Sequence, residues 1–169
     1  MAGHSLLNQV RTKSEVVVVD DASYNVILSY NKVIGIDGYV VGVKFTDGTG
    51  SMDSSLAKSA NGIRLSLAVS HKTIQMLKPD LHQIAILGFY LLTDDIDTNR
   101  PGGGDVKIWA YTRQARTIHK ACKDKLQYLT RFDVQGGTAW AITEKPYSAY
   151  EHMSVLENEI AKQLRISLC

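Results

Sequence analysis

The sequence predicts an α+β fold, in which a mostly antiparallel sheet is packed by a long basic amphipathic helix and by a C-terminal helix. Three observations predict it: β-branched and alternating apolar runs fill the first half of the chain, helical and strand periodicities meet between Arg113 and Thr143, and the chain ends in a helical pattern. With 169 residues the chain can bury a core without a metal or a disulfide. We expect a flexible N-terminal arm over residues 1–14 and a single α+β domain over residues 15–169.

The first expected strand of the domain contains four consecutive valines, Val16, Val17, Val18 and Val19. β-Branched side chains favour strands because they fit a pleated surface. If this strand lies at the edge of the sheet, its unpaired backbone groups would attract a strand of another molecule. These valines are therefore candidates for self-association, and an ordinary internal strand is the equally open alternative.

The next apolar runs predict a series of strands joined by turns. Residues 26–30 and 33–36 read as strands, and Asp37-Gly38 joins them to a further strand over residues 39–45, because Asp-Gly between apolar runs is typical of a hairpin.

Between residues 63 and 92 the pattern predicts a strand, a short helix and another strand. Residues 63–69 alternate between apolar and polar, which is typical of a half-buried strand. Ser70 can cap a short helix that Pro79 ends, because the residue before a proline avoids helical geometry. The apolar run over residues 84–92 favours a strand, and a continuous helix from Leu81 is the alternative.

The end of the chain adds one more strand and a helix. Residues 94–105 read as a polar, glycine-containing loop, and residues 106–111 as a strand that carries Trp109. Ser148 and Glu151 have the spacing of a capping box, and the apolar positions that follow repeat at helical intervals. We expect a C-terminal helix to begin there.

The central unit of the chain is a helix with one apolar and one basic face. On a helix of 3.6 residues per turn, one side collects the apolar residues Ile118, Cys122, Leu126, Leu129 and Phe132. The basic residues that lie roughly opposite are Arg113, Arg116, Lys120, Lys123 and Arg131. A turn at Gly136-Gly137 and a strand with Trp140 complete the unit. The basic face is either a contact surface for an acidic partner or an ordinary solvated helix surface.

Composition limits the classes of function. The formal net charge is only +2, so binding to a polyanion would depend on local patches rather than on the whole molecule. Two cysteines, Cys122 and Cys169, do not form the framework of an oxidised secreted protein, and the N-terminus lacks an apolar signal core, so we expect an intracellular, reducing context. The longest apolar run is about half of a membrane span.

No set of residues predicts catalysis. Ser70 and His71 are neighbours in sequence, which does not make them a nucleophile and its base, and the five histidines lack metal-ligand spacing. Cys122 projects from an apolar stripe, which indicates packing. The acidic run at residues 94–97 and the glycines at 102–104 lack the other parts of calcium-binding or phosphate-binding loops. The sequence thus predicts no catalytic residue, no metal site, no cofactor and no enzyme activity.

Several short motifs resemble one family. A basic helix at Lys123 to Phe132, followed by the strand sequence Gly137-Thr138-Ala139-Trp140, resembles the C-terminal half of rhabdovirus matrix proteins. Upstream, Ala68-Val69-Ser70-His71, a short helix and the apolar segment Ile84 to Leu92 are similar in order to the central region of that family. The resemblance covers roughly residues 63 to 143.

This resemblance implies a viral assembly protein without enzyme activity. Such a protein forms homo-oligomers, condenses the nucleoprotein-RNA helix, and links it to the inner, anionic face of the membrane and to the envelope glycoprotein. It resides in the virion and in the host cytoplasm, peripheral at membranes. The basic face would then contact acidic nucleocapsid or anionic lipid. The chain contains no Pro-Pro-x-Tyr budding motif and few basic residues at its N-terminus, which indicates a plant-infecting member.

The alternative is a small soluble α+β enzyme or ligand-binding protein. In that case we expect a compact monomer with a pocket under the loop at residues 94–105, stabilised by a small molecule.

Overall fold

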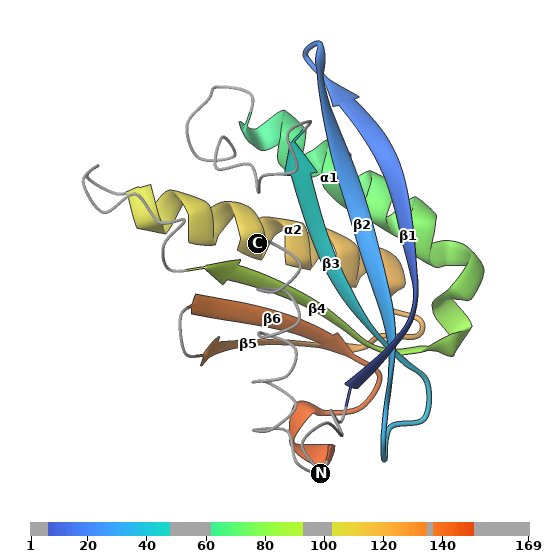
Figure 1. The fold of residues 1–169 in the computed structure, drawn as a ribbon. Coiled ribbons are helices and arrows are strands. Elements are labelled where there is room, and N and C mark those ends of the chain that lie inside the picture. The colour runs from blue at the N-terminus through green and yellow to red at the C-terminus, as the bar shows by residue number, and fades with distance from the viewer. Residues whose placement is uncertain (1–6, 48–61, 93–102, 135–136, 151–169) are drawn as a thin grey trace, which may run out of the picture.

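The α+β class is confirmed by the computed structural model, which describes residues 7–47, 62–92, 103–134 and 137–150 (Figure 1). This part of the chain forms a six-stranded sheet in the order β1-β2-β3-β4-β6-β5. Strands β3 and β4 are parallel, and the other four neighbouring pairs are antiparallel, so the sheet is mixed. Two α-helices pack against it.

Strands β1 (Leu7–Val19) and β2 (Ala22–Val33) form a long hairpin. Its two-residue turn, Asp20-Asp21, has φ angles of 49° and 66°, as a type I′ turn requires. The order of the sheet places β1 at its edge. Of the two alternatives for the valine run, an edge strand and an internal strand, the edge strand is therefore correct. Residues 7–14 were expected in a flexible arm, and that expectation is wrong, because they pair with β2 as the first half of β1.

Strand β3 (Tyr39–Asp47) follows β2 after the predicted turn. The Ile36 amide donates to the Val33 carbonyl oxygen at 3.1 Å, so the expected strand over 33–36 is part of the turn. Gly38 has a φ of 115°, and a Cβ at this position would lie 3.0 Å from the Gln83 carbonyl oxygen. Only glycine satisfies both the conformation and the close approach to the start of β4.

Helix α1 (Gly62–Leu77) replaces the strand that was predicted over residues 63–69. A short alternating window also fits a helix, and the buried residues Leu65, Val69 and Met76 have helical spacing. Ser70 and Thr73, which are also buried, each donate a hydrogen bond of 2.7 Å to the carbonyl oxygen four residues earlier. Their hydroxyl groups are thereby satisfied inside the helix.

The segment that contains Pro79 ends α1 as predicted, since the chain continues there as a 3-10 helix, η2 (Lys78–Gln83). The apolar run that follows is strand β4 (Ile84–Leu92), which confirms the strand and excludes the helix from Leu81. Residues 84–89 of β4 are buried, on both faces of the sheet.

Helix α2 (Gly103–Cys122) begins ten residues before Arg113 and ends ten residues before Phe132. The strand predicted over residues 106–111 is therefore wrong, and so is the helix beyond Cys122. The Lys125 and Leu126 amides both donate to the Cys122 carbonyl oxygen, at 3.0 and 2.8 Å, which closes the last turn.

Strand β5 (Tyr128–Val134) then pairs with β6 (Gly137–Thr143), the predicted strand that carries Trp140. The described chain ends with a short 3-10 helix, η4 (Tyr147–Ala149). The predicted C-terminal helix otherwise lies outside the described residues.

Both α-helices cover the same face of the sheet, α1 against β1 and β2 and α2 against β4, β5 and β6 (Figure 1). The core lies between the helices and this face. Its largest fully buried side chains include Leu28 and Tyr30 of β2, Leu87 of β4, Ile118 of α2 and Trp140 of β6.

Candidate functional site

The sheet divides between its two parallel strands. Strands β3 and β4 pair only from Tyr39 to Gly42 and from Ile84 to Gly88 in the described part of the chain. Beyond these pairs β3 continues along β2 to Asp47, and β4 continues along β6 to Leu92. The two strand ends diverge toward the N-termini of the helices (Figure 1). We call this opening, between residues 43–47 and 89–92, the fork.

Glycines occupy the point where the strands separate. Gly42 and Gly88 are the last pair between β3 and β4, and Ala141 of β6 lies beside Gly88. Side chains alternate between the faces of a strand. Since Val41 and Leu87 belong to the core cluster under the helices, these three small residues belong to the other face. The base of the fork therefore carries little side-chain volume on the face opposite the helices.

The chain leaves the sheet in two directions at the fork. Helix α1 follows β3 and packs on β1 and β2, whereas α2 follows β4 and packs on β4, β5 and β6. Ligands of open α/β sheets bind outside the carboxyl ends of parallel strands, and the carboxyl ends of β3 and β4 form the fork. The fork is therefore the candidate functional site.

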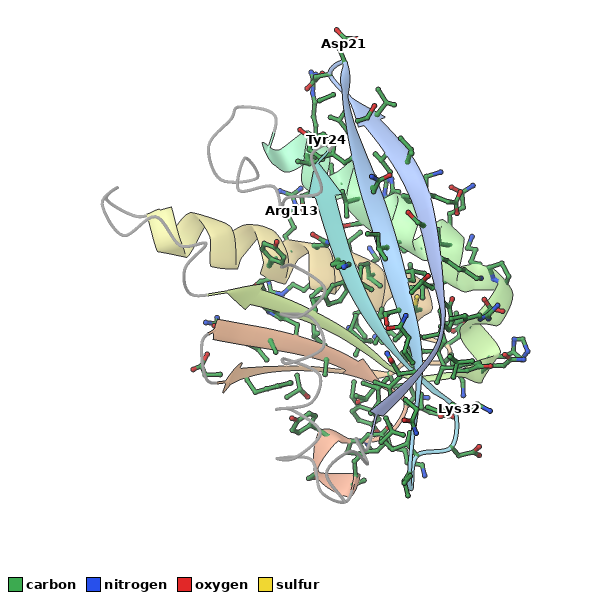
Figure 2. The ribbon with its side chains drawn as sticks, in the orientation of Figure 1. Asp21, Tyr24, Lys32 and Arg113 are labelled. Atoms are coloured by element: carbon green, nitrogen blue, oxygen red, sulfur yellow. The ribbon has the colours of Figure 1, made fainter. Side chains whose placement is uncertain are left out.

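Two basic side chains belong to this part of the molecule. Lys44, on the β3 side of the fork, is half-buried, and burial lowers the pKa of its ammonium group. Arg113 belongs to α2, and in the view of Figure 2 it lies by the opening between β3 and β4. Helix α1 begins at Gly62, and the first amides of a helix have no partner within it. These groups together favour a negatively charged ligand.

The structure brings together three of the five residues predicted for the basic face. All five are exposed. Arg113, Arg116 and Lys120 follow one another at helical spacing on α2. Lys123 lies just after the helix, and Arg131 lies on β5, where its guanidinium carbon is 5.9 Å from the centroid of the Trp140 ring. Residues 123 and 131 thus do not continue a helical face.

The four valines of β1 do not share one environment. Val17 is buried and Val19 is half-buried against the core, while Val16 and Val18 are 55% and 66% exposed on the opposite face. The edge position and these two exposed side chains are the features that self-association requires. Self-association itself stays a prediction.

Sequence reasoning missed a cluster of charged and aromatic residues around Asp80 of η2. The Asp80 carboxylate accepts hydrogen bonds from Lys13 and from the Tyr30 hydroxyl (3.2 Å), and forms an ion pair with Arg11 (3.1 Å). The Arg11 guanidinium lies 4.5 Å from the centroid of the Tyr30 ring. No spacing signal could reveal these contacts, because Lys13 and Asp80 are 67 positions apart.

This cluster changes the acid–base properties of its members. The hydrogen bond from Lys13, with the Arg11 charge beside it, lowers the pKa of Asp80. Burial, together with the Asp80 charge and its hydrogen bond, raises the pKa of Tyr30 to about 12. The cluster fastens η2 to β1 and β2, so it is a structural feature at the opposite end of β3 and β4 from the fork.

A cavity of about 570 Å³ lies near that opposite end. It is lined by residues of β2, the β2–β3 turn, β3, η2, the α2–β5 connection and the residue after β6, among them Lys32, Tyr39, His82, Lys125 and Glu144. Lys125 and Glu144, two of these lining residues, form an ion pair of 2.7 Å. A pocket was expected under the loop at residues 94–105. Most of that loop, up to residue 102, lies outside the described part of the chain.

Cys122 is buried, as its place in the apolar stripe predicted, and burial raises the pKa of its thiol. His119 is held by a contact of 2.7 Å between its Nε2 atom and the Gln127 carbonyl oxygen. Within the described ranges no group of three or more histidine, cysteine or acidic residues could hold a metal ion.

Comparisons with known families, curated proteins and solved structures found no match for this chain. Neither α1 nor α2, the α-helices of the described residues, is long and apolar enough to span a membrane.

Proposed function

We propose that this protein binds an extended small molecule in the fork between β3 and β4. The ligand carries amide groups along its length and a negative charge at one end. The observation that carries the proposal is the early end of the β3–β4 pairing at Gly42 and Gly88, although both strands continue to Asp47 and Leu92.

The backbone of the fork supports this type of ligand. Beyond Gly42 and Gly88, among the described residues, each strand pairs only on its outer side, with β2 for β3 and with β6 for β4. The inner amide and carbonyl groups are then available to pair with an extended molecule, as in the addition of a peptide strand to a sheet edge. A ligand between the two strands can bond to both.

Charge sets the orientation of the ligand. Lys44 lies on β3 just beyond Gly42, whereas Arg113 belongs to α2 and the first amides of α1 follow the carboxyl end of β3. Helix N-termini favour anions, phosphate groups in particular, because their amides point outward and the helix dipole is positive there. The negative end of the ligand therefore lies toward α1, and its amide portion between the strands.

Coenzyme A is a suitable probe, because its extended arm carries amide groups and its other end carries phosphates. We expect it to slow hydrogen exchange of backbone amides in residues 43–47 and 89–92 by about tenfold or more, because bonded amides exchange only through opening. ADP, which has phosphates without the arm, should leave β3 and β4 unchanged. Unchanged exchange in both segments with bound coenzyme A would place the ligand elsewhere.

A pair of variants on one helix tests the charge part of the proposal. Arg113→Ala should weaken coenzyme A binding by about tenfold, the effect of losing one charged contact of about 1.4 kcal/mol. Arg116→Ala is the matched control, since Arg116 is also exposed and lies one turn further along α2. If calorimetry gave the two variants equal affinities for coenzyme A, Arg113 would not be part of the binding site.

A matrix-type assembly function is the second proposal. It is supported by the exposed cations of α2 and by the exposed valines of the edge strand β1. A few cations near an anionic surface contribute about 1 kcal/mol each, which gives reversible, salt-sensitive binding. The segment Lys123 to Phe132, which enters the resemblance as a helix, is a turn and strand β5 in this chain. The proposal therefore depends on the exposed cations and valines more than on the resemblance.

Charge reversal tests the assembly proposal. The double variant Lys120→Glu/Lys123→Glu should lose binding to anionic vesicles and salt-sensitive assembly, measured by light scattering across a salt series. Both residues are exposed, so the variant should fold with an unchanged melting temperature to within a few degrees. Assembly of this variant at the wild-type level would contradict the proposal, and the uncharged variant Lys120→Gln/Lys123→Gln should give an intermediate result.

A further inference from the structure

We infer that two copies of this chain pair through β1, antiparallel and about a two-fold axis at Ser14, so that their sheets join into one. The inference gives a register to the self-association predicted from the valines. It depends neither on a ligand in the fork nor on binding to a nucleocapsid or membrane.

The first support is the direction of the free backbone groups. Val19 and Ala22 close the two-residue hairpin, so they form a hydrogen-bonded pair, and such pairs alternate along an antiparallel ladder. The odd-numbered residues from 11 to 19 then bond to β2. The even-numbered residues 12, 14, 16 and 18 direct their amide and carbonyl groups away from β2, to the side where no described strand pairs with β1. Pairing with a second β1 satisfies these groups.

The second support is the exposed face of the same residues. Thr12 and Ser14 are exposed, and Val16 and Val18 are 55% and 66% exposed. Val10, at the bulge of β1, is 50% exposed. About the proposed axis, Val18 lies opposite the partner's Val10. Val16 lies opposite the partner's Thr12. Val18 and the partner's Val10 thereby cover one another across the junction.

Charge favours this register over axes at Thr12, Lys13 and Glu15. With the axis at Ser14, Lys13 lies opposite the partner's Glu15, and the symmetry produces this pair twice. An axis at Lys13 or at Glu15 places each of these residues opposite its own copy, and an axis at Thr12 opposes Arg11 to the partner's Lys13. Like charges directly opposite destabilise a strand pair.

The charged residues are already positioned for this contact. Lys13 is held by Asp80, and Glu15 lies 3.7 Å from the Lys72 ammonium group. Their side chains are 28% and 50% exposed, so both can reach a partner without breaking these contacts. In the pair, Lys13 lies between two carboxylates and Glu15 between two ammonium groups.

Disulfide trapping tests the register in a Cys169→Ser background, in which the remaining Cys122 is buried. Ser14→Cys places each new thiol opposite its own copy and should give a covalent dimer under mild oxidation. Val16→Cys is the matched control, because its thiol faces the partner's Thr12. It should form covalent dimer no faster than the background protein does. Faster trapping of Val16→Cys than of Ser14→Cys would overturn the register.

The equilibrium of the untrapped protein tests the pairing itself. Sedimentation of the wild-type chain should show a concentration-dependent dimer, and Val16→Lys should weaken it at least about tenfold, because an edge lysine opposes strand addition. Because Val16 is exposed, this variant should fold like the wild type, which a melting temperature close to that of the wild type would confirm. A wild-type monomer at all concentrations, with background trapping of Ser14→Cys, would refute the inference. Val16→Lys should still bind coenzyme A like the wild type, so that a failure of pairing can be told apart from a failure of ligand binding in the fork.

Discussion

Replacement of Trp140 by alanine should destabilise the protein by about 3–5 kcal/mol, the usual effect of deleting a buried tryptophan. The side chain is only 1% exposed, at the centre of β6. Its ring stacks on Tyr111 of α2 with centroids 5.8 Å apart and lies under the Arg131 guanidinium. One side chain thus joins α2 to two strands. Since many domains are stable by only 5–15 kcal/mol, Trp140→Ala should lose a large share of its stability, which denaturant titrations should show as a lower midpoint.

The matched variant is Trp140→Phe. The indole nitrogen of Trp140 has no hydrogen-bond partner among the described residues, so phenylalanine removes no such bond there. It also retains a ring that can stack on Tyr111. We expect a loss of about 1–2 kcal/mol, which reflects mainly the smaller volume. If the two variants were equally unstable, ring packing would not be the source of the stability.

Replacement of Asp80 by alanine should cost about 2–3 kcal/mol, because charge-assisted hydrogen bonds contribute more than neutral ones. The loss leaves Arg11 and Lys13 without their shared carboxylate and the buried Tyr30 hydroxyl without its acceptor. Arg11 can turn to water, since its side chain is 41% exposed, which limits the cost. Arg64→Ala is the control. Its ion pair with Asp20 is exposed and should contribute less than about 1 kcal/mol.

The pH dependence of stability shows how much of the effect of Asp80 depends on its negative charge. The pKa of Asp80 is lowered in the folded protein, so the stabilisation is present above the unfolded value of 3.8 and is lost as the pH falls through the folded value. Asp80→Asn should remove this acid-dependent part. For Tyr30 the folded pKa is raised to about 12, so stability is lost as the pH rises from 10 toward 12. An unchanged acid profile in Asp80→Asn would show that other carboxylates dominate.

The sequence alone predicted elements whose signals are local. The Asp37-Gly38 turn, the strand over 84–92, the strand with Trp140 and the buried position of Cys122 all follow from residue type and short-range spacing. The valine run was also predicted as a strand, although its place at the edge of the sheet was left open. The basic residues of α2 were predicted as exposed, and they are.

Where two periodicities fitted the same segment, tertiary contacts chose between them. Residues 63–69 and 106–111 alternate over a window too short to exclude a helix, and both lie in helices because burial under the sheet extends over several turns. Residues 128–132 fitted a helical stripe, but pairing with β6 makes them a strand. Propensity is weak beside such packing.

The sequence by itself thus determined the α+β class, the local turns and the exposed side chains available at the surface. Only the tertiary structure decided that β3 and β4 run parallel, that they separate after Gly42 and Gly88, and that Asp80 fastens η2 to β1. The physical reason is that these features depend on contacts between distant positions, whose formation is set by the packing of the whole sheet rather than by any local preference of the residues.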